Sequence, residues 1–337
     1  MAAEPGRVDT VRLQDLAYAH RQSAVLLSAL ELGLFTQISR EVCTLSALAE
    51  ALDITETNAE RLLTACAALG LVVREEGGFT NAADVDRFLV EGRKGYAGPW
   101  LLAARAERER WGGLCEALRR KDPPRVLGMY ESFTVEQARA LHEATYSVGM
   151  GAGRRFVRQC DLSGRRQILD LGGGSGCYSI CAANLYPELR AIVFDLPSVA
   201  AVAEEFIAKH GLCDRIVAVG GDFISDALPR GADVAIMASN LPQYAPELIR
   251  SVVAKAHDAL VAGGEMHLIG ETLRPGKDGP LGPALWGLAE ALGNSTGVAH
   301  SESEVVEYLE AAGFVDVSVN EFVPGSLTRV TGYKEAE

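Results

Sequence analysis

The stretch Gln167-Ile-Leu-Asp-Leu-Gly-Gly-Gly-Ser-Gly-Cys177, continued by Tyr-Ser-Ile-Cys-Ala-Ala-Asn-Leu185, decides the fold class of this chain. Residues 167–171 form the short apolar run of a buried strand, and residues 177–185 begin a helix. The glycines between them let the backbone pass close to a ligand, since a Cβ atom there would collide with it. Strand, glycine turn and helix open a nucleotide-binding βαβ unit, but this motif alone does not identify the nucleotide.

Two further strand ends narrow the choice of nucleotide. The strand Arg190-Ala-Ile-Val-Phe-Asp195 ends in an acid about twenty residues after the glycines, where a carboxylate can accept hydrogen bonds from both ribose hydroxyls. The next strand ends in Gly221-Asp222-Phe223, and an acid followed by an aromatic ring suits the adenine amino group and ring face. The glycine cluster is spaced as Asp170-x-Gly-Gly-Gly-x-Gly, which differs from the dinucleotide motif. These features favour S-adenosylmethionine over a dinucleotide as the cofactor.

The rest of the C-terminal half continues the alternation of strands and helices. We expect a strand over Ala232–Ser239, a helix over Glu247–Leu260, then a glycine turn and a strand over Gly263–Glu271. A βαβαβ chain gives a largely parallel sheet, and the ligands of such sheets bind at the carboxyl ends of the strands. The predicted site is therefore a rim that contains Gly172, Asp195, Asp222, Asn240 and Glu271.

The N-terminal sequence is mainly helical. Its apolar spacing and caps predict helices over 11–38, 44–52 and 55–69, and a two-stranded hairpin over 71–80, in winged-helix order. The third of these helices carries Glu56 and Glu60 against the cation Arg61, which favours a dimerisation role over DNA binding. The whole chain is thus predicted to be an α/β protein, with a winged-helix dimerisation domain (1–98), a helical linker that contributes to the substrate pocket (99–157) and a Rossmann-like catalytic domain (158–337).

Composition agrees with a protein whose partner is a small molecule. The 337 residues carry a formal net charge of −13, and nucleic-acid binding depends on clustered Lys and Arg. No apolar run approaches the roughly eighteen residues of a membrane span, and the N-terminus lacks the apolar core of a signal peptide. We therefore expect a cytoplasmic protein with no nucleic-acid or membrane partner. Seven cysteines without a Cys-x-x-Cys pair are expected to be reduced core residues, with no metal site.

Several motifs occur together in one known family: Leu169-Asp-Leu-Gly-Gly-Gly-Ser-Gly176, Val193-Phe-Asp-Leu-Pro197, Gly221-Asp-Phe223, Gly263-Gly264 and Ala311-Ala-Gly-Phe314. With its winged-helix N-terminal unit, the chain resembles the class I O-methyltransferases that include plant caffeate-type enzymes, hydroxyindole O-methyltransferase and bacterial natural-product tailoring enzymes. The resemblance implies a homodimer exchanged through the helical domain and S-adenosylmethionine as cofactor. The cofactor-binding residues that it implies are Gly172, Gly174, Asp195, Asp222 and Phe223. We add Asp170, Leu196 and Ser239 as further candidates for cofactor binding.

The chain departs from this family at the general base. Typical members have Leu-His-Asp-Trp after the fourth strand, and this chain has Leu241-Pro242-Gln243-Tyr244 there. Of the two family acids that orient the base, Glu271 is present and the other falls on Ala299. A proline cannot take a proton, so three hypotheses stay open: transfer to a carbon, which we favour, transfer to an oxygen by proximity or with another base, or loss of methyl transfer. A ligand-sensing winged-helix regulator is the alternative from another class.

The remaining candidates concern the acceptor, which we expect to be a small aromatic or enolisable metabolite of secondary metabolism. The candidate catalytic residues are His142, Tyr244, Glu271 and His300. The candidate substrate-binding residues are Tyr130, His142, Asn240, Gln243 and Trp286. Each has a structural alternative, because a lone histidine or an aromatic residue at helical spacing more often packs in the core or lies on the surface than binds a ligand.

Overall fold

The computed structural model describes residues 8–336, and the chain divides into two compact units between Ala106 and Glu107. Each unit has its own hydrophobic core. The helix α7 (Gly98–Gly112) runs from one unit into the other.

The N-terminal unit is mainly helical, as predicted. Its other elements are α1 (Val11–Tyr18), α2 (His20–Glu31), α3 (Leu34–Ser39), α4 (Leu45–Ala51), α5 (Glu56–Ala68), β1 (Val72–Glu75), β2 (Gly78–Asn81) and α6 (Ala83–Phe88). Thr44 and Thr55 cap α4 and α5, because each hydroxyl accepts a backbone N–H from the first turn. The antiparallel pair β1–β2 follows α5, so the predicted order of helices and hairpin is present.

The core of the N-terminal unit leaves α1 outside it. Phe35 of α3, Leu63 of α5 and Phe79 of β2 are buried together. None of the residues of α1 is buried, and its Leu13 and Leu16 are 55% and 61% exposed. An apolar helix surface of this kind is typical of a protein interface.

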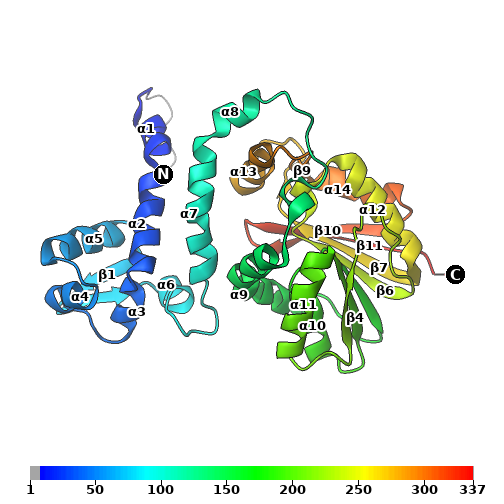
Figure 1. The fold of residues 1–337 in the computed structure, drawn as a ribbon, viewed down its shortest axis with the longest axis horizontal. Coiled ribbons are helices and arrows are strands. Elements are labelled where there is room, and N and C mark those ends of the chain that lie inside the picture. The colour runs from blue at the N-terminus through cyan, green and yellow to red at the C-terminus, as the bar shows by residue number, and fades with distance from the viewer. Residues whose placement is uncertain (1–7, 337) are drawn as a thin grey trace. The chain divides into compact units, whose positions relative to one another are not determined.

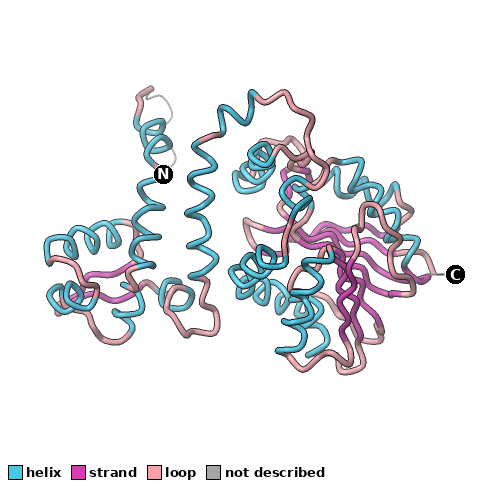
Figure 2. The backbone as a smooth tube through the Cα atoms, in the orientation of Figure 1, coloured by secondary structure: helices cyan, strands magenta, loops and turns pink. Residues whose placement is uncertain are grey.

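The C-terminal unit is built on a seven-stranded sheet in the order β10-β11-β7-β6-β3-β4-β5. The strands are β3 (Gln167–Leu171), β4 (Arg190–Asp195), β5 (Ile216–Gly220), β6 (Ala232–Ala238), β7 (Leu260–Gly270), β10 (Val315–Val323) and β11 (Leu327–Tyr333). The neighbours from β7 to β5 pair in parallel, and β11 is antiparallel to both β7 and β10. Figure 2 shows these strands at the centre of the unit. The largely parallel sheet that the sequence predicts is therefore confirmed.

Helices cover both faces of this sheet (Figure 1). The long helix α9 (Val135–Gln159), with α10 (Cys177–Leu185) and α11 (Pro197–Lys209), packs on one face around Phe156 and Ile180. The helices α12 (Pro246–Ala259) and α14 (Glu302–Ala311) pack on the other face around Val253 and Leu309. The remaining elements are α8 (Leu114–Arg119), α13 (Leu281–Ala289), the short strands β8 (Thr272–Leu273) and β9 (His300–Ser301), and the 3-10 helices η1 (Gly128–Ser132), η2 (Leu241–Gln243) and η3 (Glu290–Gly293).

Two features differ from the sequence expectation. The pair Gly263-Gly264, expected as a turn before the fifth strand, lies inside β7, which begins at Leu260 directly after α12. The hairpin β10–β11 has no counterpart among the expected strands. Most of β10 is exposed at the sheet edge, so it lacks the apolar run by which buried strands are recognised.

The order of the strands places a ligand crevice at one edge of the sheet. From the central strand β3 the chain moves to β4 and β5 on one side, and then crosses to β6 on the other. The carboxyl ends of β3, β4 and β6 therefore meet at a topological switch point, where α/β proteins bind their ligands.

Candidate active site

Asp195 and the glycine turn form one hydrogen-bonded unit at the ends of β4 and β3. The Asp195 carboxylate accepts the backbone N–H groups of Gly174 at 2.8 Å and Leu196 at 2.7 Å. Gly172 and Gly174 have φ angles of 62° and 57°, which side chains with a Cβ rarely adopt. Burial raises the pKa of Asp195 to about 6, and the two N–H groups oppose this rise. The turn thus holds a carboxylate where the sequence predicts a ribose contact.

Asp170, in β3, is a buried carboxylate with one unpaired oxygen. Ser179 Oγ donates to its Oδ2 at 2.7 Å, and Oδ1 has no partner within residues 8–336. Burial raises the pKa of Asp170 to about 6, an effect that Ser179 opposes and the charge of Asp195 reinforces. Because a buried acceptor without a donor is costly, Oδ1 favours a hydrogen bond from a bound molecule.

Asp222 and Phe223 follow β5 in a loop that is fixed to α12. The Asp222 carboxylate accepts hydrogen bonds from two donors of its own loop at 2.8 and 3.1 Å. Lys255 Nζ donates to the carbonyl oxygens of Phe223 and Ile224 at 2.8 and 3.1 Å. The buried Phe223 ring lies edge-on to Tyr244, with the ring centroids 5.4 Å apart. An aromatic surface and a carboxylate are therefore adjacent here, as the sequence predicts for an adenine site.

The segment from Ser239 to Tyr244 contains the position of the family base. Ser239 has a φ of 59°, and its backbone N–H donates to the Ile269 carbonyl at 2.8 Å. Asn240 Nδ2 donates to the Gly172 carbonyl at 3.5 Å, so the amide lies over the glycine turn. Pro242 is buried in η2. This position thus offers an aliphatic ring and no group that can take a proton.

His300, a candidate catalytic residue, is fully buried, and both of its ring nitrogens are engaged. Nδ1 lies 2.9 Å from the Tyr308 hydroxyl, and Nε2 lies 3.0 Å from the Tyr244 carbonyl oxygen. A carbonyl accepts only, so Nε2 carries the proton. Burial lowers the pKa of His300, which is therefore neutral near pH 7. This geometry favours a structural role for His300, which fixes the backbone at Tyr244.

Glu271 follows β7 and also has an unpaired oxygen. Its Oε2 is buried and has no hydrogen-bond partner in the part of the chain that the structure describes. Burial raises the pKa of Glu271. The pKa of Tyr178 is raised by burial and by neighbouring charges, with Asp170 and Glu271 among them, and its hydroxyl is unpaired as well. Two predicted acids and one tyrosine thus share a buried polar region.

His142 projects from α9 onto the glycine turn. A Cβ atom added at Gly174 would lie 2.6 Å from His142 Cε1, so the imidazole is in contact with this part of the turn. Burial lowers the pKa of His142 to about 4. The ring is neutral near pH 7 and lies against the turn at which the sequence predicts the cofactor.

Tyr130 of η1, a candidate substrate-binding residue, is affected by the charges of other residues of the site. Burial raises its pKa to about 12, the charges of Glu290 and Asp195 add to this, and a hydrogen bond with Gln243 opposes it. Tyr244 is also buried, and its neighbours likewise include Asp195 and Glu290. The structure therefore brings together two tyrosines that the sequence analysis proposes and one carboxylate, Glu290, that it does not.

The segment 281–293 contributes one predicted residue and one unpredicted one. Trp286 of α13, a candidate for stacking on the acceptor, is 41% exposed. Glu290 begins η3 directly after this helix. The signal that could have found Glu290 is its isolation, since it is the single charged residue of the apolar run from Leu281 to Leu292.

Most of the chain matches one family in two separate parts. Residues 14–91 match the O-methyltransferase dimerisation domain, and residues 113–315 match the O-methyltransferase domain. The chain belongs to the O-methyltransferase family. It is an S-adenosylmethionine-dependent methyltransferase with an N-terminal dimerisation domain and a C-terminal catalytic domain.

Individual relatives agree with this assignment. The 3-hydroxy-5-methyl-1-naphthoate 3-O-methyltransferase of Streptomyces sahachiroi is 32% identical over 328 residues, which cover 96% of this chain and 94% of that protein. The L-tyrosine C(3)-methyltransferase of Streptomyces lavendulae is 34% identical over 187 residues, which cover 55% of this chain and 50% of that protein. The crystal structure of human N-acetylserotonin methyltransferase in complex with SAM has a TM-score of 0.80 at 24% identity, and covers 99% of this chain and 100% of that one.

The residues of this O-methyltransferase fit its cofactor. A glycine turn in the left-handed region, a carboxylate tied to that turn and the unpaired Asp170 Oδ1 lie at one sheet edge. These are the groups that a nucleoside with an amino-acid tail needs, since its ribose hydroxyls and its ammonium group are donors.

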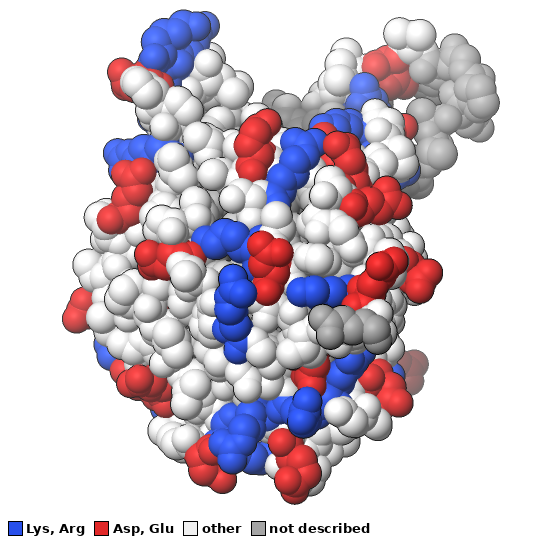
Figure 3. Space-filling model, turned by 90° about the vertical axis from the view of Figure 1, so that its right-hand side faces the viewer, with Lys and Arg blue, Asp and Glu red and all other residues white. Residues whose placement is uncertain are grey.

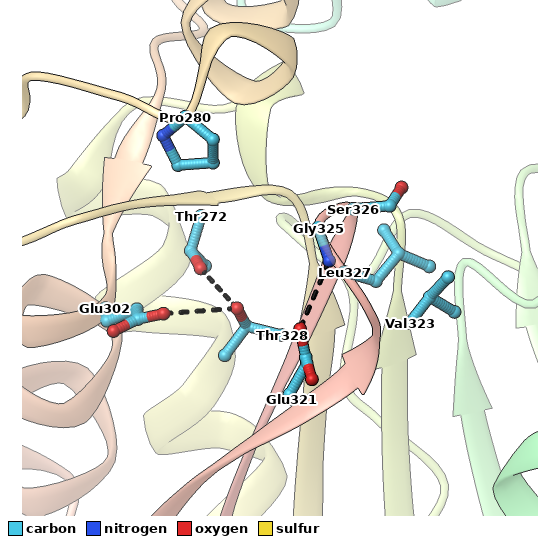
Figure 4. Close-up of a pocket in the computed structure, with 9 residues that line it drawn as sticks. All are labelled: Thr272, Pro280, Glu302, Glu321, Val323, Gly325, Ser326, Leu327 and Thr328. Carbon is cyan, nitrogen blue, oxygen red and sulfur yellow. Dashed lines mark hydrogen bonds between the residues drawn. The ribbon is translucent and has the colours of Figure 1, made fainter.

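The O-methyltransferase has a further hollow away from the glycine turn. The hollow in Figure 4, of about 210 Å³, is lined by residues of β8, α14 and the β10–β11 hairpin. Its polar groups bond to one another, as Thr272 Oγ1 donates to Thr328 Oγ1 at 2.8 Å and Gly325 N–H donates to Glu321 at 3.2 Å. On the face drawn in Figure 3, acidic and basic side chains are interspersed. Within residues 8–336, no helix is long and apolar enough to cross a membrane.

Proposed function

We propose that this enzyme transfers a methyl group to a hydroxyl oxygen of a small aromatic metabolite in natural-product biosynthesis. The observation that carries the proposal is the position of two tyrosines, the buried Tyr244 and the partly buried Tyr130, whose pKa values are raised in part by the charge of Asp195. A flat acceptor packs well against aromatic rings, and these rings adjoin the carboxylate that we assign to the cofactor. Named relatives that methylate oxygen support the choice of atom.

The cofactor-binding residues follow from the geometry of the rim. Asp195 would accept the ribose hydroxyls, and Asp222 with Phe223 would bind adenine. Gly172, Gly174 and Asp170 would hold the amino-acid tail, while Leu196 and Ser239 shape the backbone around it. When bound, S-adenosylmethionine supplies a methyl group on a positively charged sulfur, a group that needs alignment with the acceptor more than further activation.

The acceptor would bind beside the glycine turn. We assign acceptor contacts to Tyr130, His142, Asn240, Gln243 and Trp286. His142 adjoins Gly174, and Gln243 acts on the pKa of Tyr130, so these side chains can fix the acceptor next to the methyl group. Tyr244 and Glu271 remain candidates for proton handling. His300 would act as a positioning residue through the Tyr244 backbone.

Carbon is the second candidate for the methylated atom. Pro242 replaces the family base, and a ring carbon becomes nucleophilic once a neighbouring hydroxyl has lost its proton. The similar L-tyrosine C(3)-methyltransferase acts on a ring carbon by its name. The prediction that carbon is favoured has no further support, because most of the named relatives are O-methyltransferases.

We further infer a homodimer formed through the dimerisation domain, with the apolar side chains of α1 in the interface. A cytoplasmic location stays a prediction from the sequence.

One experiment tests the proposed function. The purified enzyme is incubated with methyl-labelled S-adenosylmethionine and a set of hydroxylated naphthoates and other phenols, and the label is located by NMR. A methoxy signal supports oxygen transfer, and a signal on a ring carbon supports the second candidate. If no acceptor is methylated and calorimetry detects no binding of S-adenosylhomocysteine, the proposal is wrong.

A further inference from the structure

Glu290 is a partly buried carboxylate in a turn that packs against η2. Ser295 Oγ donates to Glu290 Oε2 at 2.6 Å, and the Gly297 N–H donates to Ser295 Oγ at 2.8 Å. A Cβ atom on Gly297 would collide with the Pro242 carbonyl oxygen, so this turn is in direct contact with η2. The carboxylate is therefore fixed beside the segment in which the family base is missing.

The segment that precedes η1 is hydrogen-bonded to the turn that follows Glu290. The Arg125 N–H donates to the Asn294 carbonyl at 2.7 Å, and the Thr296 N–H donates to the Arg125 carbonyl at 3.0 Å. A Cβ atom on Gly128 would lie 2.9 Å from Ser295 Cβ. Three segments that are distant in the sequence, around η1, η2 and η3, thus converge around Glu290.

Two tyrosines link Glu290 to the cofactor side of the site. After burial, the charge of Glu290 is the largest cause that raises the pKa of Tyr130, and Asp195 comes next. Burial raises the pKa of Tyr244 too, and both carboxylates add to this effect. The geometric link is η2, because it contacts the turn of Glu290 and directly follows Asn240, whose Nδ2 donates to the Gly172 carbonyl of the glycine turn at 3.5 Å.

The Glu290 carboxylate retains capacity to accept a proton. Oε2 accepts from Ser295, and no residue of the described part of the chain donates to Oε1. Burial raises the pKa of Glu290, while Ser295 and the charge of Arg110 oppose this. A raised pKa makes a carboxylate a better base near neutral pH. In the same turn, Thr296 Oγ1 is buried and has no partner among residues 8–336.

We propose that Glu290 binds the hydroxyl group of a phenolic acceptor and takes its proton during methyl transfer, in place of the absent histidine. This inference rests on the proposed function. The acceptor O–H bond breaks, and the proton passes to Glu290 Oε1. The oxygen lone pair forms the new bond to the methyl carbon, and the electrons of the breaking C–S bond stay on sulfur. A carboxylate and a sulfonium are thereby converted into a neutral acid and a neutral thioether, so atoms and charge balance.

The test compares the wild-type enzyme with Glu290→Gln and with the matched control Glu310→Gln, an exposed glutamate of α14. Each protein is saturated with S-adenosylhomocysteine and titrated with 4-nitrophenol, whose phenolate ion absorbs visible light. A carboxylate next to the bound hydroxyl disfavours the phenolate. The pKa of 4-nitrophenol should therefore be about one unit higher when the probe is bound to the wild type than in solution. Glu290→Gln should reduce this difference, because only the effect of burial remains, and Glu310→Gln should keep it in full. 4-Nitroanisole, which lacks the hydroxyl, should bind the wild type and Glu290→Gln equally.

Turnover gives the second measurement. With a phenolic acceptor, Glu290→Gln should lower kcat by about 10²- to 10⁴-fold, the usual contribution of a general base, and leave S-adenosylhomocysteine affinity unchanged. Equal ionisation of bound 4-nitrophenol in the wild type and Glu290→Gln, or no binding of the probe by an enzyme that binds S-adenosylhomocysteine, would overturn the role of Glu290. If the wild-type enzyme does not bind S-adenosylhomocysteine, the proposed function is overturned instead.

Discussion

Asp195 Oδ2 lies 2.8 Å from the backbone nitrogen of Gly174, and this hydrogen bond ties the end of β4 to the turn that follows β3. The same carboxylate accepts the N–H of Leu196, the first residue after its strand, at 2.7 Å. The turn and the acid therefore form one preorganised unit, and a change in either is expected to alter the other.

Asp195→Asn should weaken the binding of S-adenosylhomocysteine by roughly 10- to 100-fold, because hydrogen bonds to a charged acceptor are the stronger ones. Burial raises the pKa of Asp195 to about 6, so the wild-type affinity should fall as the pH is lowered through this value. The variant should depend less on pH over the same range. Calorimetry at several pH values measures both effects. Asp214→Asn, an exposed control, should bind like the wild type, and equal affinity of Asp195→Asn would contradict the assignment.

Asp170→Asn should stabilise the protein without ligand at pH 7. Burial raises the pKa of Asp170 from 3.8 to about 6, so the folded state takes up a proton that the unfolded state does not hold between these values. The ionised Asp170 carboxylate therefore destabilises the folded state above pH 6, and this destabilisation decreases as the pH falls from 7 toward 4. The variant lacks this cost, of order 1–3 kcal/mol at pH 7. Thermal unfolding should show a higher Tm at pH 7 and a smaller gain on acidification; a lower Tm at pH 7 would count against the argument.

His300→Phe should lower the free energy of unfolding by roughly 2–4 kcal/mol, because the hydroxyl of Tyr308 and the carbonyl of Tyr244 each lose a buried partner. Denaturant unfolding measures this loss. His142→Ala, at a partly exposed position, should change the free energy by less than about 1 kcal/mol and lower turnover. Normal stability with lost turnover in His300→Phe would instead place His300 in the reaction.

Local sequence patterns predict the strand ends and the glycine turn to which we assign the cofactor. The apolar run before Gly172, the acid that ends the strand at Asp195 and the pair Asp222-Phe223 are all set by residues that are close in sequence. A glycine turn and a strand end allow few arrangements, so residue type and spacing are enough.

The acceptor side depends on contacts between distant segments, and local patterns do not report them. The sequence around His300 fits a catalytic base as well as a buried structural residue. The burial of His300 arises from its packing against Tyr308 and η2. Glu290 resembles a solvent-facing residue of a helix, and its position follows from the turn that Ser295 fixes. The strand β10 is an exception, because its apolar and polar residues alternate over Val315–Asn320, which is a local strand signal, and this strand pairs with β11 at the sheet edge.

Gly153→Ala should destabilise the C-terminal unit by roughly 1–3 kcal/mol. A Cβ atom at Gly153 would lie 2.6 Å from the Cys177 carbonyl oxygen, so α9 and α10 would have to separate. Gly151 lies on the same helix with no atom within 4 Å of an added Cβ, which makes it a matched control. Gly151→Ala should be neutral or stabilising by up to about 1 kcal/mol, since alanine favours a helix. Equal unfolding free energies of the two variants would refute the close packing of α9 on α10.

Replacement of Leu13 and Leu16 by glutamate should convert the inferred homodimer into single chains. Both side chains are more than half exposed on α1, which has no buried residue, and the dimerisation domain of the family includes this helix from residue 14 onward. Charges on an apolar interface must lose their water when the chains associate, at a cost of several kcal/mol. Light scattering after size exclusion should give the mass of one chain for the double variant and of two chains for the wild type. Gln14→Glu, which adds a charge at a polar position of the same helix, should remain dimeric. A double variant that keeps the mass of two chains would exclude α1 from the interface.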